Sequence, residues 1–160
     1  MRTHRDVATL AVIQVLCFVL LAHLEPEFFL LHLYQSVLYM AILLMLFYFH
    51  ERWAYMIGML ASIVWLVLAF ATGLLGGAAR QLVRLVQGNW PNSPVSLLAG
   101  LTALLAVLMI GFTARHWIRE YAVLGKWRRT FFVSLGVVAV YYITLVVWFW
   151  HMIPQIASAG

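Results

Sequence analysis

Five long apolar stretches, separated by short polar segments, set the pattern of this sequence. They cover residues 6–23, 27–49, 53–76, 94–113 and 130–153. An α-helix needs about 20 apolar residues to cross a hydrocarbon core about 30 Å thick, and each stretch is close to this length or longer. The pattern predicts an all-α, polytopic integral membrane protein in which residues 1–160 form one domain, a compact bundle of five transmembrane helices.

Proline, serine and glycine residues stand at several of the expected helix ends. Pro26 and Pro94 lie where the first turn of a helix tolerates proline, and Ser93 can cap the fourth helix. Gly76 and Gly77 are expected to end the third helix.

A short amphipathic segment at residues 77–87 separates the third and fourth stretches. It contains two arginines and four large apolar residues: Arg80, Arg84, Leu82, Val83, Leu85 and Val86. A basic amphipathic helix suits the boundary between lipid headgroups and acyl chains. We therefore expect a short interfacial helix between the third and fourth membrane helices.

The composition agrees with a bilayer as the solvent. Apolar residues make up 66% of the chain and charged residues only 9%, and the mean hydropathy is +0.98, which no soluble domain matches. The net charge of +5 comes from basic residues in short runs between apolar stretches, so it indicates topology and not nucleic-acid binding. Cys17 is the only cysteine, which excludes a disulfide within the chain and a cysteine-based zinc site.

Basic residues also predict the orientation. With the N-terminus in the cytoplasm, only Arg80 and Arg84 of the ten Lys and Arg residues lie outside. The other eight are Arg2, Arg5, Arg52, Arg115, Arg119, Lys126, Arg128 and Arg129. The positive-inside rule then predicts a multi-pass protein of the cell (inner) membrane, with its N-terminus in and its C-terminus out. The alternative, a signal peptide in the first stretch, fits poorly because the stretch is long and no small-residue cleavage site follows it.

Small residues recur every four positions in the third stretch. One set is Ala54, Gly58 and Ser62, and the other is Ala69, Gly73 and Gly77. Such ridges allow another helix to approach closely. We expect them to pack inside this chain, with a face for a second copy or another subunit as the alternative.

The second stretch carries the most informative polar pattern. His32, Gln35, Ser36 and Tyr39 follow one helical face, and such a stripe cannot comfortably face lipid. Gln14 and Tyr141 lie near mid-depth on other helices, where they can meet the stripe. These six residues form a hypothetical ligand-binding pocket that is open to the outer face.

Histidines and carboxylates gather on the outer side in the predicted topology. They are His23, His32, His151, Glu25 and Glu27. A metal ion or a haem could use such groups, although none has tight ligand spacing, and the alternative is a set of interfacial or hydrogen-bonded structural groups. On the inner side, His116 and Glu120 are four residues apart and share a helical face. We expect this pair to be solvated or to form a salt bridge.

The sequence predicts a class of function and no reaction. Mid-helix charges, phosphate-binding loops and GxSxG motifs are missing, which argues against ion-coupled carriers, ATPases and ordinary hydrolases. We expect a non-enzymatic subunit or accessory protein whose partners are the lipid bilayer and other membrane subunits or its own copies. A bundle that binds haem, quinone or another small molecule is the alternative, and a small oligomeric channel or carrier is the third hypothesis.

Overall fold

The computed structural model describes residues 4–48, 50–90, 93–121 and 127–150. Within these ranges the chain is helical and has no strand. The elements are α1 (Arg5–Leu24), the 3₁₀ turn η1 (Pro26–Phe28), α2 (Phe29–Phe47), α3 (Glu51–Ala71), α4 (Leu74–Val86), α5 (Pro94–Glu120) and α6 (Trp127–Trp148).

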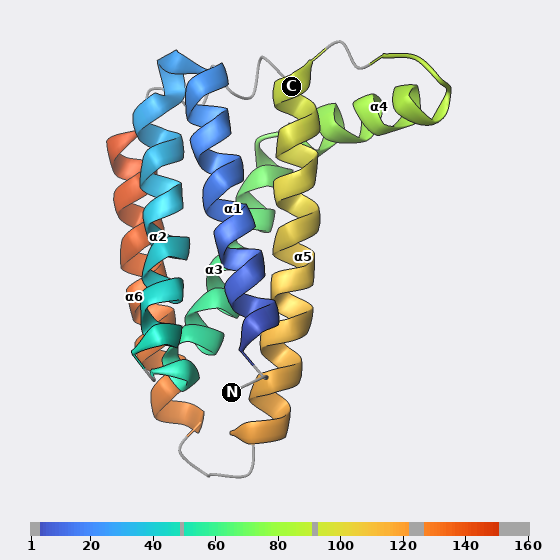
Figure 1. The fold of residues 1–160 in the computed structure, drawn as a ribbon. Helices are drawn as coiled ribbons and strands as arrows, with labels where there is room; N and C mark the ends of the chain where they lie inside the picture. The colour runs from blue at the N-terminus through green and yellow to red at the C-terminus, as the bar shows by residue number, and fades with distance from the viewer. Residues whose placement is uncertain (1–3, 49, 91–92, 122–126, 151–160) are drawn as a thin grey trace.

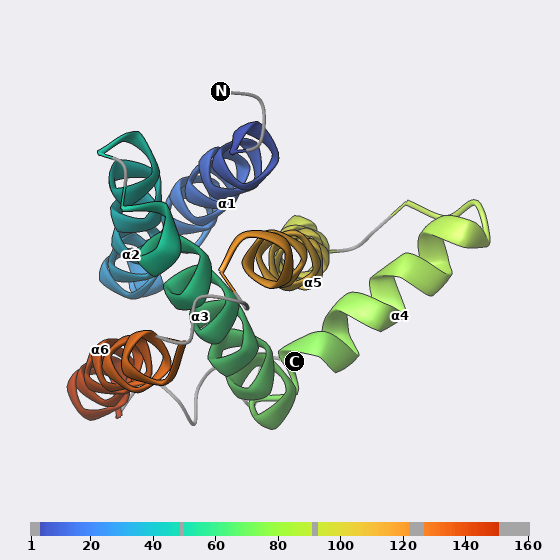
Figure 2. The ribbon, with the colours of Figure 1, turned by 90° about the horizontal axis from the view of Figure 1, so that it is seen from below.

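The five long helices of the described ranges, α1, α2, α3, α5 and α6, run alternately up and down in a bundle (Figure 1). We call the end where α1 finishes and α5 begins the upper end, and the end where α1 and α3 begin the lower end. Helix α4 is different, because it projects sideways from the upper end (Figures 1 and 2).

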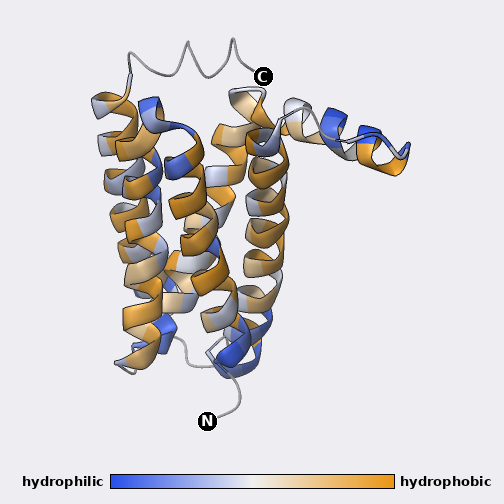
Figure 3. Cartoon of the chain, turned by 45° about the horizontal axis from the view of Figure 1, so that its top comes forward, coloured by the Kyte–Doolittle hydropathy of each residue, from blue (hydrophilic) through white to orange (hydrophobic). Residues whose placement is uncertain are grey.

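Apolar residues cover the five long helices, and hydrophilic residues gather at their lower ends, at the turn between α1 and α2, and on α4 (Figure 3). Among the described residues, α1, η1 with α2, α3, α5 and α6 are the five helical segments long and apolar enough to cross a membrane. The prediction of an all-helical chain with five such segments is confirmed.

Helix α3 is the central helix of the bundle. It passes between α2, α5 and α6 (Figure 2) and is the most buried of the five long helices. The Tyr142 hydroxyl of α6 donates a hydrogen bond to the Ala61 carbonyl of α3 at 3.1 Å. This bond connects the central helix to α6.

The end of α3 differs from the expected helix of residues 53–76. The helix stops at Ala71, and Gly73 follows with a φ of 76°. A positive φ disfavours residues with a Cβ and commonly ends helices. Gly76 and Gly77 do not have this conformation and lie inside α4, so they do not end the third helix.

The other helix ends follow the local sequence more closely. Ser93 caps α5, since its side-chain oxygen accepts a hydrogen bond from the Ser96 backbone N–H at 3.2 Å, and Pro94 occupies the first turn. Pro26 opens the 3₁₀ turn η1, and α2 begins three residues later. Helix α5 continues to Glu120, seven residues beyond the expected segment 94–113.

Candidate functional site

A partly enclosed cavity of about 160 Å³ lies at the upper end of the bundle. All five long helices, η1 and the first turn of α4 contribute to its wall. The apolar lining comprises Phe18, Leu21, Phe28, Leu31, Trp65, Leu68, Ala69, Leu74, Gly77, Val95, Ala99, Leu145, Val146 and Phe149. The polar lining comprises Glu25, His32, Gln35, Thr72 and Ser96.

One wall of the cavity carries an imidazole held by a carboxylate. His32 is buried, and its Nε2 lies 3.0 Å from Oε2 of Glu25. Because a carboxylate accepts hydrogen bonds, this contact favours a proton on Nε2. Gln35, one turn further along α2, also lines the cavity, and no hydrogen bond within the described residues occupies its amide.

The remaining polar groups of the cavity are already bonded. The Thr72 hydroxyl donates to the Leu68 carbonyl at 2.9 Å. The Ser96 hydroxyl donates to the Ser93 side-chain oxygen at 3.2 Å. A bound molecule would therefore find most of its polar contacts on the α2 wall, at His32 and Gln35.

Two residues of the predicted pocket lie deeper, in a buried polar layer. Gln14 and Tyr39 are almost fully buried, and Tyr39 lies beside Gln14 and Ser62. The Gln14 Nε2 donates to the Thr102 carbonyl at 3.3 Å, which connects α1 with α5. Within the described residues, Oε1 of Gln14, the Tyr39 hydroxyl and Oγ of Ser62 lie near one another but form no well-aligned hydrogen bond.

The other two predicted pocket residues make contacts elsewhere. The Ser36 hydroxyl donates to the Leu33 carbonyl of its own helix at 2.7 Å. Tyr141 stacks on Tyr34 with ring centroids 4.5 Å apart. Of the six residues, only His32 and Gln35 line the cavity.

The proposed metal or haem ligands are only partly brought together. His32 and Glu25 are in contact, whereas His23 and Glu27 are exposed. His151 lies outside the described residues. In the described part of the chain, no group of three or more His, Cys, Asp or Glu side chains is placed to hold a metal ion.

The two sets of small residues have different surroundings. Ala54, Gly58 and Ser62 are buried, and a Cβ added to Gly58 would lie 3.5 Å from Thr113 Cγ2 on α5. Their ridge is thus filled by the chain itself. Of the second set, Ala69 and Gly77 line the cavity, and Gly73 lies in the turn between α3 and α4.

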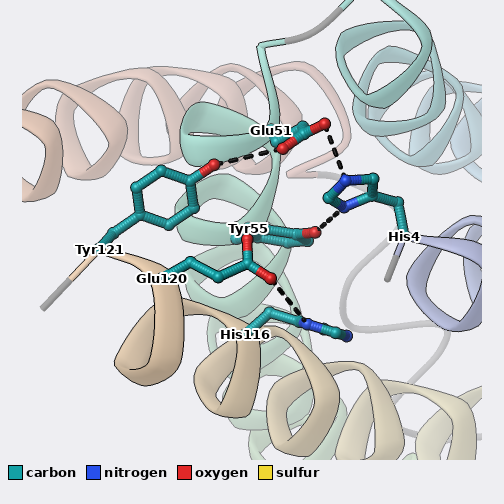
Figure 4. A network of polar contacts seen from close by, with 6 residues as sticks. All are labelled: His4, Glu51, Tyr55, His116, Glu120 and Tyr121. Atoms are coloured by element: carbon teal, nitrogen blue, oxygen red, sulfur yellow. Dashed lines mark hydrogen bonds and ion pairs between the residues drawn. The ribbon is translucent and has the colours of Figure 1, made fainter. Parts of the chain in front are cut away.

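A second polar cluster closes the lower end of the bundle (Figure 4). His4 Nε2 lies 2.8 Å from Oε1 of Glu51, and His4 Nδ1 is in contact with the Tyr55 hydroxyl. The Tyr121 hydroxyl donates to Oε2 of Glu51 at 3.3 Å. A neutral imidazole with its proton on Nε2 satisfies both contacts of His4, since Nε2–H donates to the carboxylate and Nδ1 accepts from the phenol.

Ring stacking extends this lower cluster to α5. The rings of Tyr55 and His116 are stacked with centroids 5.3 Å apart. His116 Nδ1 lies 3.5 Å from Oε1 of Glu120, an ion-pair contact that is too long for a good hydrogen bond. The cluster joins the start of α1 and α3 to the end of α5.

The environment of Tyr121 disfavours its ionised form. Burial, followed by the negative charge of Glu51, raises the pKa of Tyr121 to about 12. The phenol therefore stays protonated at neutral pH and can donate its hydrogen bond to Glu51.

The sequence alone misses two features of these sites. The aromatic walls of the cavity come from helices far apart in sequence, and Phe18, Trp65 and Phe149 carry no motif that marks them. For the lower cluster, the sequence shows only pairs one helical turn apart, His116 with Glu120 and Glu51 with Tyr55; the contact with His4 requires the fold.

No protein-family model, curated protein sequence or solved structure matches the chain.

Proposed function

We propose that this chain is a five-span protein of the cell (inner) membrane with the lower end of its bundle in the cytoplasm. Six described basic residues support this orientation: Arg5, Arg52, Arg115, Arg119, Arg128 and Arg129 lie at or near the lower helix ends. Arg80 and Arg84 belong to α4 at the upper end. The upper cavity would then face the outer leaflet, and α4 would lie at the outer interface.

The proposed function is reversible binding of a small, mostly apolar molecule that carries a polar carbonyl or hydroxyl head. The upper cavity is the observation that carries this proposal. Ligand sites are typically concave and apolar with a few polar groups that fix orientation, and this cavity has apolar walls with His32 and Gln35 on one side.

The size of the cavity limits what enters it. Its volume of about 160 Å³ is close to that of an engineered cavity of about 150 Å³ that binds benzene. One six-membered ring would fill it, so a longer molecule must leave its chain outside. A quinone-like lipid fits this limit, because its single ring can enter the cavity while its tail stays in the bilayer.

The polar wall selects the head group. The Gln35 amide can both donate and accept, while Glu25 holds the neighbouring His32 ring in place. A carbonyl oxygen of a ring would accept from Gln35, and a ring hydroxyl would donate to it. Neither contact requires the ligand to be charged.

A benzoquinone with a ten-carbon chain is a direct probe. Quinones quench indole fluorescence, and Trp65 lies in the cavity wall. The quenching of Trp65 is obtained by subtracting the fluorescence quenching of the Trp65→Phe variant from that of the wild type. We expect this difference to saturate with quinone concentration in detergent micelles, whereas non-saturable quenching in both proteins would reject the proposal.

Two leucine substitutions on α3 provide a matched pair. Ala69→Leu fills the cavity, and we expect it to weaken saturable quenching at least about tenfold, or by about 1.4 kcal/mol. Ala71→Leu adds the same atoms at an exposed position outside the cavity and should leave the affinity unchanged. Equal affinities in the two variants would show that the quinone binds elsewhere.

An accessory role in a membrane complex is the second proposed function. It is supported by α6, the least buried long helix, which leaves a row of large apolar side chains uncovered: Phe132, Val140, Ile143 and Val147. The ridge at Ala54, Gly58 and Ser62 gives no support, because α5 covers it. Cross-linking from position 143 in native membranes should capture a partner subunit if this role is correct, and lipid alone if it is not.

A further inference from the structure

Helix α4 has two chemically different faces. At about 100° per residue, Arg80 and Arg84 lie on one side, and Leu75, Leu85 and Val86 lie on the other. The segment has the strongest amphipathic pattern of all the described helices. Such a helix is built for a boundary between an apolar and a polar medium.

The first turns of α4 anchor it to the bundle. Gly77 and Ala78 are buried, and a Cβ added to Gly100 of α5 would lie 3.1 Å from the Ala78 Cβ. Beyond this contact the helix leaves the bundle (Figure 2). Val86 at its end is 86% exposed, and Trp90 just after it is 90% exposed.

We propose that α4 is an arm that binds anionic phospholipid headgroups at the upper membrane interface. The arm projects from the end of five helices of membrane-spanning length (Figure 1). This position places its apolar face against acyl chains and its two arginines at the level of the phosphates. Guanidinium groups pair well with phosphate oxygens, and an exposed tryptophan suits the same depth.

Charge complementarity selects the lipid over a second copy of the chain. A symmetric contact between the α4 helices of two copies would bring their arginines together, whereas an anionic headgroup supplies the opposite charge. The proposal is independent of what the upper cavity binds, because Arg84 and Trp90 do not line it.

Energy transfer from Trp90 tests the proposal. The protein is reconstituted in phosphatidylcholine bilayers that contain a small fraction of either phosphatidylglycerol or phosphatidylcholine with a dansyl group on an acyl chain. The contribution of Trp90 is the difference between the wild type and Trp90→Phe. We expect more transfer to the labelled phosphatidylglycerol than to the labelled phosphatidylcholine, and a smaller excess at high salt.

Charge variants identify the groups responsible. Arg84→Gln should lower the preference for the anionic lipid about fivefold, as expected for one basic residue near a charged surface. Arg84→Lys should keep most of the preference. Arg119→Gln removes an exposed arginine at the lower end and should leave the Trp90 signal unchanged, while circular dichroism confirms that every variant is folded.

Three outcomes would overturn the proposal. Equal transfer to both labelled lipids would show that the arm has no preference for negative charge. If the double variant Arg80→Gln, Arg84→Gln kept the preference for labelled phosphatidylglycerol, that preference would come from another part of the chain. Disulfide cross-linking of Val86→Cys between two copies, at a yield that rises with the protein-to-lipid ratio, would assign the arm to a protein interface.

Discussion

Tyr34 and Tyr141 form a reciprocal pair that joins α2 to α6. The Tyr34 hydroxyl donates to the Tyr141 backbone carbonyl at 3.3 Å, and the Tyr141 hydroxyl donates to the Tyr34 backbone carbonyl. Their rings are stacked at an interplanar angle of 18°. Since α6 packs mainly on α3, this pair is a specific polar connection between the second and the last helix of the bundle.

Removing either hydroxyl should weaken the bundle by a modest amount. Tyr34→Phe and Tyr141→Phe each keep the ring and lose one hydrogen bond, which costs about 0.5–1.5 kcal/mol in proteins and often about 0.6 kcal/mol between membrane helices. The free energy of unfolding in mixed micelles of mild detergent and dodecyl sulfate measures the loss. In a double-mutant cycle the two changes should be coupled; strictly additive effects would show that the two bonds form independently.

This pair shows where prediction from sequence stops. The five helices follow from the lengths of the apolar stretches, and the polar stripe on the second stretch contains His32 and Gln35, which line the upper cavity. Tyr34 is not part of that stripe, and it lies 107 positions from Tyr141. No local pattern specifies which two tyrosines meet, because helix packing decides it.

The Arg52 side chain gives a second connection that can be tested. Arg52 Nε donates to Oγ1 of the buried Thr130 at 2.6 Å and so links α3 to α6 at the lower end. Thr130→Val keeps the shape and removes the acceptor, which should cost about 1.5–3 kcal/mol for a bond to a charged group. Thermal unfolding followed by circular dichroism measures the effect.

Thr113→Val is the matched control for that substitution. The Thr113 side chain is equally buried, but its hydroxyl donates only to carbonyls of its own helix, such as that of Met109 at 2.6 Å. Its loss should be nearly neutral, since such bonds add little to helix stability. Equal destabilisation by both changes would mean that Arg52 contributes nothing through Thr130.

Alkaline pH should weaken the lower cluster through Tyr121. Its pKa is raised in the folded protein to about 12, above the usual value of about 10 for tyrosine. A raised pKa means that the folded state holds this proton more tightly, so its stabilising contribution is complete below pH 10 and is lost as the pH rises from about 10 to about 12. Between these values the wild type should lose more unfolding free energy than Tyr121→Phe.

Tyr48→Phe is the control for the alkaline experiment. Tyr48 is 72% exposed, and its substitution should leave the pH dependence of the wild type unchanged. If Tyr121→Phe and Tyr48→Phe both follow the wild-type curve up to pH 12, then the folded protein does not hold the Tyr121 proton more tightly than the unfolded chain does.

The break after α3 marks a second limit of sequence reasoning. Three glycines, Gly73, Gly76 and Gly77, follow α3. The adjacent pair Gly76 and Gly77 is the more obvious place for a helix to end. The chain instead takes a positive φ at Gly73, which starts α4 earlier and brings Leu74 and Gly77 to the cavity wall. Composition shows that a break is near, and only the backbone conformation shows which glycine makes it.

Adding a methyl group to Gly100 should weaken the contact between α4 and α5. The new Cβ would lie 3.1 Å from the Ala78 Cβ, so α4 must shift by a few tenths of an ångström or lose its anchor. The same substitution at Gly58 meets Thr113 Cγ2 at 3.5 Å, an ordinary contact. Alanine is favoured over glycine inside a helix by about 0.5–1 kcal/mol, so Gly58→Ala should be neutral or stabilising, whereas Gly100→Ala should lose that gain.

Hydrogen exchange of the backbone amides of residues 79–86 reports on the anchor directly: it should accelerate in Gly100→Ala and remain at the wild-type rate in Gly58→Ala. Unchanged exchange in Gly100→Ala would show that the contact with Ala78 does not hold α4 against the bundle.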